Sequence, residues 1–95
     1  MIVGICTVQL RLEGNHSLKG KRSALKPLLA RLHREFNVAA AEVGQQDNWE
    51  FAQIGIATIG NARAHADEVL QRAVRWIEDG RFNVQLVDYA IEIIP

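Results

Sequence analysis

The amino-acid sequence predicts one α+β domain, in which two helices cover one face of a four-stranded antiparallel sheet. Three observations predict it. Apolar residues alternate as in strands near both ends and in the middle of the chain. Two stretches repeat apolar residues at helical spacing, and a polar loop joins the two central strands. The 95 residues suffice for a single domain with one core.

The first predicted element is a strand over residues 2–12. Its side chains alternate between two faces of a sheet. The more apolar face carries Ile2, Cys6, Val8, Leu10 and Leu12 and is expected to meet the helices. The other face carries Val3, Ile5, Thr7, Gln9 and Arg11.

A helix is predicted over residues 17–36. Gly14-Asn15-His16 form a turn, and Ser17 is a favourable N-cap residue. One apolar stripe is expected to comprise Leu18, Leu25, Leu29, Leu32 and Phe36. Pro27 lies opposite this stripe, so it is expected to bend the helix outward or to start a second segment.

A β-hairpin follows, with strands over residues 37–43 and 49–59 joined by the polar residues 44–48. A second helix is predicted over residues 61–79, capped by Asn61 and stopped at Asp79-Gly80. Its inward positions are expected to be Ala62, Ala66, Leu70, Ala73 and Ile77.

The last predicted strand spans residues 84–94. Val87, Tyr89, Ile91 and Ile93 are expected to face the core, with Leu86, Asp88 and Glu92 outward. The resulting order, βαββαβ, is the ferredoxin-like plan. Right-handed crossovers would then bring residues 13–22, 44–50 and 79–83 together at one end of the sheet.

Charge is distributed unevenly along the chain. Residues 1–34 hold seven Lys and Arg against one acid, and residues 35–95 hold four Arg against ten acids, which gives +6 beside −6. Because the sequence pI is about 6.8, any nucleic-acid footprint must be local. Three cations, Lys19, Lys21 and Arg22, crowd the predicted helix start, where the helix dipole disfavours them.

This crowding suggests an anion-binding site, which would cradle phosphate with backbone N–H groups, polar side chains and cations. The same run of charges is also typical of a helix face that is simply solvated. Trp49, in turn, could pack over the end of the hairpin instead of binding a ligand. The candidate anion- or RNA-binding residues are Asn15, His16, Ser17, Lys19, Lys21, Gln45, Gln46 and Trp49. Arg22 falls within the predicted apolar stripe, so we expect it to form a buried structural ion pair with Asp47 or Glu42.

Short motifs along the whole chain carry a family resemblance. They are Ser17-Leu18-Lys19-Gly20-Lys21-Arg22, Phe36-Asn37-Val38, Ala41-Glu42-Val43, Gln46-Asp47, Trp49, Ile54-Gly55, Asn61, Ala64-His65 and Val87-Asp88-Tyr89. In residue type and spacing they resemble the bacterial YlxP-like proteins. The resemblance implies a ferredoxin-like domain of unknown function, whose genes commonly lie beside those for transcription elongation, translation initiation and ribosome maturation factors. The family often has Glu at the position of Gly20, so the reciprocal capping box with Ser17 is lost here.

Two classes of function are therefore expected. The first is a non-enzymatic RNA- or ribosome-associated protein that uses the basic helix start. The second is a protein-interaction or homo-oligomerisation module that uses the open sheet face, with Val3, Ile5, Phe51 and Leu86 as contact residues. Small-anion binding or acylphosphatase-like catalysis is a distant third.

Other chemistry finds little support in the sequence. The stretch from Gly14 to Lys21 departs from the P-loop spacing, and no nucleophile has an evident general base. His16, His33 and His65 fall far apart in the expected fold, so neither a metal nor a cofactor is expected. A lone cysteine, with no apolar run of spanning length and no signal-peptide pattern, leads us to expect a cytoplasmic protein without a membrane partner.

Overall fold

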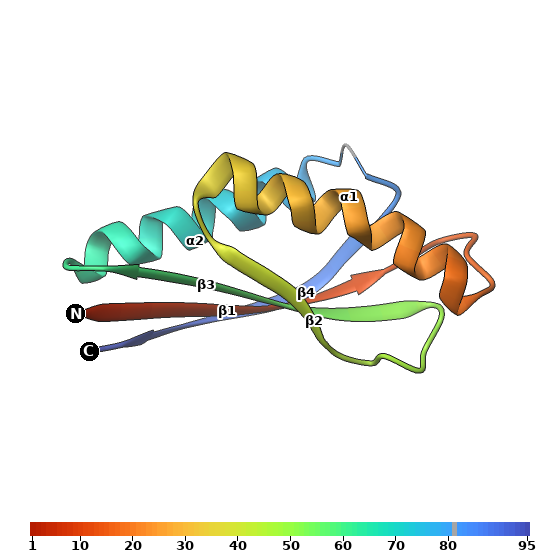
Figure 1. Cartoon of the computed structure of the whole chain (residues 1–95), viewed down its shortest axis with the longest axis horizontal. Coiled ribbons are helices and arrows are strands. Elements are labelled where there is room, and N and C mark those ends of the chain that lie inside the picture. Colours follow the sequence, from red (N-terminus) through yellow and green to blue (C-terminus); the bar gives the residue numbers. More distant parts are fainter. Residues whose placement is uncertain (81) are drawn as a thin grey trace.

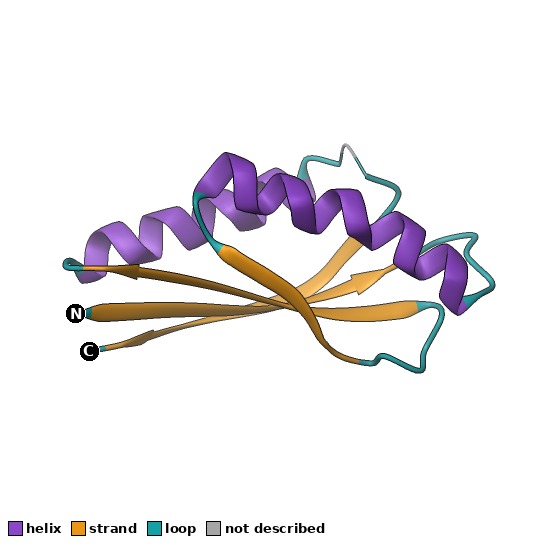
Figure 2. Ribbon diagram, in the orientation of Figure 1, coloured by secondary structure: helices purple, strands orange, loops and turns teal. Residues whose placement is uncertain are grey.

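The computed structural model describes residues 1–80 and 82–95, and its element order is β-α-β-β-α-β (Figure 1). The elements are β1 (Ile2–Arg11), α1 (Leu18–Phe36), β2 (Ala39–Gly44), β3 (Phe51–Gly60), α2 (Arg63–Glu78) and β4 (Gln85–Ile94). The four strands form one antiparallel sheet in the order β2-β3-β1-β4. Both helices lie on the same face of this sheet (Figure 2). The predicted ferredoxin-like α+β fold is confirmed.

The core lies between the sheet and the helices. Strand β1 contributes the predicted Cys6, Val8 and Leu10, and the predicted Leu12 follows it directly; all four are buried. The second helix buries Ala66, Leu70, Ala73, Val74 and Ile77, so four of its five predicted inward positions are confirmed and Ala62 is exposed. The buried stripe of α1 is Lys21, Leu25, Leu28 and Leu32, which differs from the predicted stripe at its start and middle.

The helices differ from the predictions at the start of α2 and at Pro27 in α1. Asn61 does not cap α2: the N-cap residue is Ala62, which makes no side-chain capping bond. Pro27 is exposed and lies inside one continuous helix, so it does not start a second segment. At the other end of α1, Asn37 stops the helix in the left-handed conformation, with φ of 52°.

A β-bulge changes the expected facing of β4. Strand register pairs Leu10 with Leu86 but Gln9 with Asp88, so Val87 is an extra residue. The bulge turns Leu86 toward the helix side, where it packs against the core, and it leaves Val87 exposed. The prediction that Leu86 faces outward on the open sheet face is therefore wrong, as is the core assignment of Val87. Tyr89 is exposed as well, because β4 is an edge strand.

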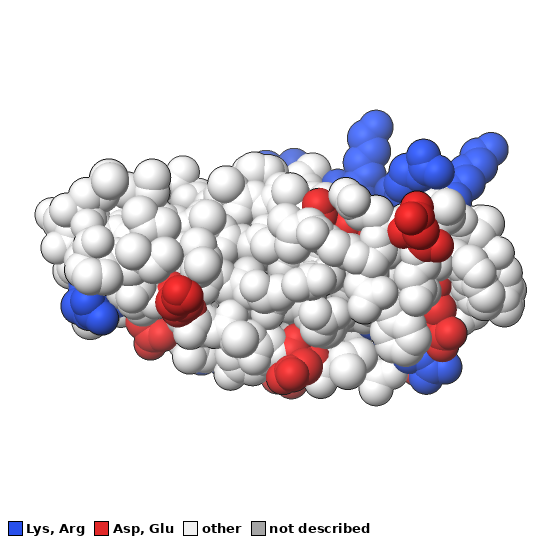
Figure 3. Space-filling model, turned by 90° about the horizontal axis from the view of Figure 1, so that it is seen from below, with Lys and Arg blue, Asp and Glu red and all other residues white. Residues whose placement is uncertain are grey.

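The face of the sheet opposite the helices is uncovered (Figure 3). The register places the predicted Val3, Ile5 and Phe51 on it, together with Ile59 and Ile94. Figure 3 shows a broad surface whose charged side chains lie mostly toward its margins. Ile59 is 69% exposed, so apolar area faces solvent here.

Among the residues that the structure describes, neither helix has the length and apolar character needed to cross a membrane.

Candidate functional site

The β1–α1 loop and the β2–β3 loop meet at one end of the sheet, as predicted. The backbone N–H of Leu12 donates to the carbonyl of Glu50 at 2.7 Å. The side-chain amide of Asn15 donates to the carbonyl of Trp49 at 2.6 Å and to that of Ser17 at 2.9 Å. Asn15 therefore ties the helix start to the hairpin loop and is occupied as a structural bridge.

Ser17 caps α1 as expected, because its hydroxyl accepts from the Gly20 N–H at 3.0 Å. Gly20 has a second role in this corner. A Cβ atom at position 20 would collide with the side-chain oxygen of Asn15. The glycine thus makes room for the Asn15 bridge, which gives a local reason for its presence at this position.

Lys21 is the buried cation of this end, and it is 1% exposed. Its ammonium group donates to the carbonyls of Gln45 and Asn48, each at 2.6 Å, and of Phe51 at 2.8 Å. Glu42 Oε2 lies 2.7 Å from the same nitrogen. The three ammonium protons are used by the three carbonyls, so the carboxylate contributes a charge contact without a proton of its own.

Two sequence predictions are corrected by this cluster. Lys21 is not a surface ligand for phosphate, because its donors are filled and solvent does not reach it. Arg22 does not form the buried ion pair with Asp47 or Glu42: it is exposed, and its Nε donates to the carbonyl of Leu18 at 3.4 Å. The predicted clamp to Glu42 exists, but it starts one residue earlier in the helix.

An exposed aromatic pair lies beside this buried cluster. The rings of His16 and Trp49 have centroids 5.6 Å apart and planes inclined by 55°. Trp49 is 43% exposed, so part of its ring is accessible to solvent. A shallow hollow of about 660 Å³ adjoins it and is lined by residues 45–50, which include the predicted Gln45 and Gln46.

Few cationic side chains lie around the His16–Trp49 ring pair. Lys19 is exposed on the first turn of α1, two residues after the N-cap. Arg11 is exposed as well, but its Nε contacts the Glu50 carboxylate at 2.9 Å. Six of the predicted anion-binding residues are exposed at this end: His16, Ser17, Lys19, Gln45, Gln46 and Trp49.

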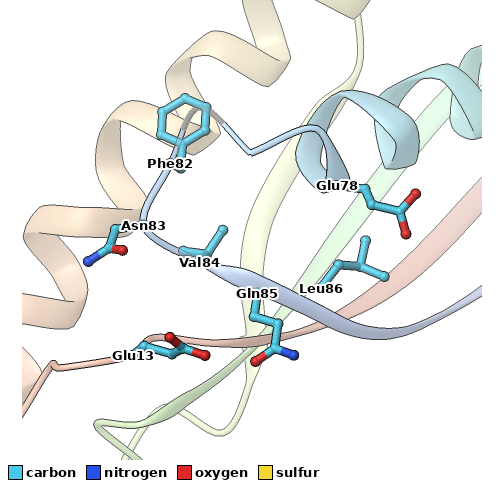
Figure 4. A pocket seen from close by; sticks show the side chains of 7 residues that line it. All are labelled: Glu13, Glu78, Phe82, Asn83, Val84, Gln85 and Leu86. Atoms are coloured by element: carbon cyan, nitrogen blue, oxygen red, sulfur yellow. The ribbon is translucent and has the colours of Figure 1, made fainter.

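A third loop borders the same end, which agrees with the prediction for residues 79–83, although position 81 lies outside the described residues. Phe82 and Asn83 from this loop share a hollow of about 290 Å³ with Glu13 (Figure 4). Glu78 also lines it, yet the two carboxylates lie on opposite sides of the hollow rather than facing each other. This arrangement shows no paired acid chemistry.

Cys6 is buried, and this burial raises the pKa of its thiol to about 11, which favours the protonated thiol over the nucleophilic thiolate.

Sequence comparisons place the chain among known proteins. The family model described as "Protein of unknown function (DUF503)" matches residues 3–91. The uncharacterized protein YlxP of Bacillus subtilis (strain 168) is 40% identical over 62 residues, which cover 65% of this chain and 67% of that protein. The chain therefore belongs to the DUF503 family of proteins of unknown function and is a YlxP-like domain.

Proposed function

We propose that this protein binds single-stranded RNA, free or as part of a ribosome, through the end of the sheet that carries His16 and Trp49. The observation that supports this most directly is the pair of exposed rings beside a polar hollow. Exposed aromatic rings are the groups on which unpaired bases stack, whatever the base identity. The buried ammonium of Lys21 holds the loop that bears Trp49, so the ring is positioned before any ligand arrives.

The phosphate backbone would be met by Lys19 rather than by Lys21. An anion near the first turn of α1 is favoured by the helix dipole and by this exposed ammonium. Glu13, Asp47 and Glu50 lie in the neighbouring loops, so the local field is only weakly positive. We therefore expect modest affinity, with about one or two phosphates neutralised and a log–log salt slope near −1.

The test measures binding of a fluorescent oligouridine by anisotropy and co-sedimentation of the protein with ribosomes. Trp49→Ala should weaken oligouridine binding by roughly 5- to 150-fold, since stacking on one ring is worth about 1–3 kcal/mol. Lys19→Glu should also weaken it and make the salt slope shallower.

Arg34→Glu is the matched control, because it makes the same charge change near the far end of α1. It should leave binding unchanged. The proposal is wrong if wild type binds neither probe, or if Trp49→Ala and Arg34→Glu bind as tightly as wild type.

A second candidate function is self-association through the open sheet face. Val3, Ile5 and Phe51 lie on this face, and Ile59 and Ile94 extend the apolar surface. Three strands of ten residues and one of six offer roughly 600 Å² per copy, so a face-to-face pair would bury about 1,200 Å², the lower limit of stable interfaces.

Analytical ultracentrifugation over a wide concentration range tests this candidate. Wild type should show a monomer–dimer equilibrium that Ile59→Lys abolishes, with Arg72→Lys on the outer helix layer as a control. A monomer at every concentration would remove the candidate.

A further inference from the structure

Both edge strands of the sheet contain a β-bulge, and they differ in the residues of their regular stretches. The β4 edge carries Asp88 and Glu92 and contains a bulge, which are common ways of preventing edge-to-edge pairing. The β2 edge carries neither Lys nor Pro, and its bulge falls between Glu42 and Gly44, so Ala39, Ala40, Ala41 and Glu42 keep regular register with β3. Strand β2 pairs with β3 alone, so alternate N–H and C=O groups point away from the sheet.

The β2 edge is also flanked by hollows on both sides. Toward the helices, two hollows of about 310 and 340 Å³ both include Arg22 and Glu42 in their lining, so they form one groove between α1 and β2. The floor of this groove near the middle of α1 is Leu25 and Leu29. Toward the open face, a hollow of about 410 Å³ is lined by the small residues Ala39, Ala41, Gly55 and Ala57 together with larger ones such as Ile5 and Val43.

The groove carries positive charge that is not neutralised within the described residues. Arg22 and Lys26 line its rim, and neither makes an ion pair there. Of the two acids that line the groove, Glu42 is paired with Lys21, and Asp47 lies at the loop end of the groove. An added strand that reaches this rim would be favoured if it brought a carboxylate.

We propose that the β2 edge and its groove bind an extended peptide segment of a partner protein, as an added strand with an apolar residue and an acidic residue on its helix-facing side. The backbone of the segment would pair with β2, which is about 20 Å long. The apolar side chain would pack on Leu25 and Leu29, and the acidic side chain would contact Arg22 and Lys26. Small side chains on its other face would continue the alanine-lined surface of the sheet.

A second copy of this chain fits the same edge less well. Pairing of β2 with its symmetry mate would place both α1 helices side by side, so that Arg22 and Lys26 of one copy would approach those of the other. Like charges at such a seam oppose assembly. The charge of the groove thus favours an acidic partner over self-pairing.

The test uses synthetic eight-residue peptides as probes. The acidic probe has threonine at alternate positions, and two valines and two glutamates at the others, in both orders. A basic probe replaces glutamate by lysine, and a blocked probe carries N-methyl groups along the backbone. Binding is followed by backbone amide shifts and hydrogen-exchange protection in NMR.

We expect the acidic probe to protect the amides of residues 39–44, and the basic and blocked probes to bind far more weakly. Arg22→Glu with Lys26→Glu should weaken the acidic probe about tenfold or more and improve the basic probe, because two exposed contacts change sign. Arg34→Glu, which adds the same kind of charge outside the groove, should leave the probe preference unchanged.

Other outcomes would overturn the proposal. These are equal binding of acidic and basic probes, protection confined to the open face or to residues 45–50, and no binding at millimolar probe. Concentration-dependent protection of β2 without a probe would indicate pairing with a second copy instead. Shifts of β2 amides caused by oligouridine would assign Arg22 and Lys26 to nucleic acid.

Discussion

Replacement of Lys21 by methionine removes the buried cation while keeping a side chain of similar length. The change deletes three hydrogen bonds from Nζ to the carbonyls of residues 45, 48 and 51. It also leaves the Glu42 carboxylate, which is 19% exposed, without its counter-ion. Loss of one member of a buried pair typically costs about 3–5 kcal/mol. Because Glu42 keeps some contact with water, we expect a loss near 3 kcal/mol, a large share of the roughly 5–15 kcal/mol available to a domain.

Urea unfolding followed by tryptophan fluorescence measures this loss as a lower midpoint at unchanged slope. Arg22→Met is the matched control, since it removes an exposed neighbouring cation, and it should shift the free energy of unfolding by less than about 0.5 kcal/mol. Adding Glu42→Gln to Lys21→Met should recover part of the loss, because the uncompensated charge disappears.

The reasoning would be refuted if Lys21→Met and Arg22→Met destabilised the protein equally, or if Lys21→Met cost less than about 1 kcal/mol. A double variant no more stable than Lys21→Met would show that the carbonyl bonds, rather than the charge pair, dominate.

Three further predictions concern other positions. Gly20→Ala should not raise the free energy of unfolding by the roughly 1 kcal/mol that is usual in a helix interior, because the new Cβ displaces Asn15. In an Asn15→Ala background the same change should give this gain, and a double-mutant cycle in which the gain is absent would contradict the prediction. The pKa of the Cys6 thiol is raised from 9.0 to about 11 in the folded state, so its contribution to stability is full below about pH 9 and falls as pH rises toward 11. The loss of folding stability between these pH values should therefore be smaller in Cys6→Ala than in wild type. Trp76→Ala should lower the free energy of unfolding by about 2–4 kcal/mol in urea, because Trp76 contacts Phe36, Phe82 and Arg31; an unchanged midpoint would show that this cluster is not stabilising.

The fold could be predicted because its signals are local and repeated. Strict alternation identified the inward side chains of β1, and helical spacing identified most of those of α2. The alternation of apolar residues could not reveal the bulge in β4. One inserted residue there exchanges the two faces of the sheet for every β4 residue that precedes it. Leu86 was assigned to the open face for that reason. A bulge has no reliable composition signal when neither residue is glycine.

The candidate site was predicted in outline and misplaced in detail. The meeting of the loops follows from topology, and the capping role of Ser17 follows from its position. The buried cation was assigned to Arg22 because arginine four residues after Leu18 falls near an apolar stripe. The spacing of Lys21, Leu25, Leu28 and Leu32, four, three and four residues apart, was the signal available for the correct stripe.

The burial of Lys21 also changes what the basic helix start means. Three cations at a helix N-terminus suggested an external anion, because the sequence offered no internal compensation. The structure supplies that compensation for one of them, with Glu42 and three loop carbonyls around a single ammonium. The remaining two diverge in their surroundings. Lys19 stays beside the loops that carry His16 and Trp49, whereas Arg22 lines the groove against β2. In place of a single phosphate cradle we therefore propose two adjoining surfaces, which share Gln46 and Asp47. The charge reversals Lys19→Glu and Arg22→Glu should act on different ligands.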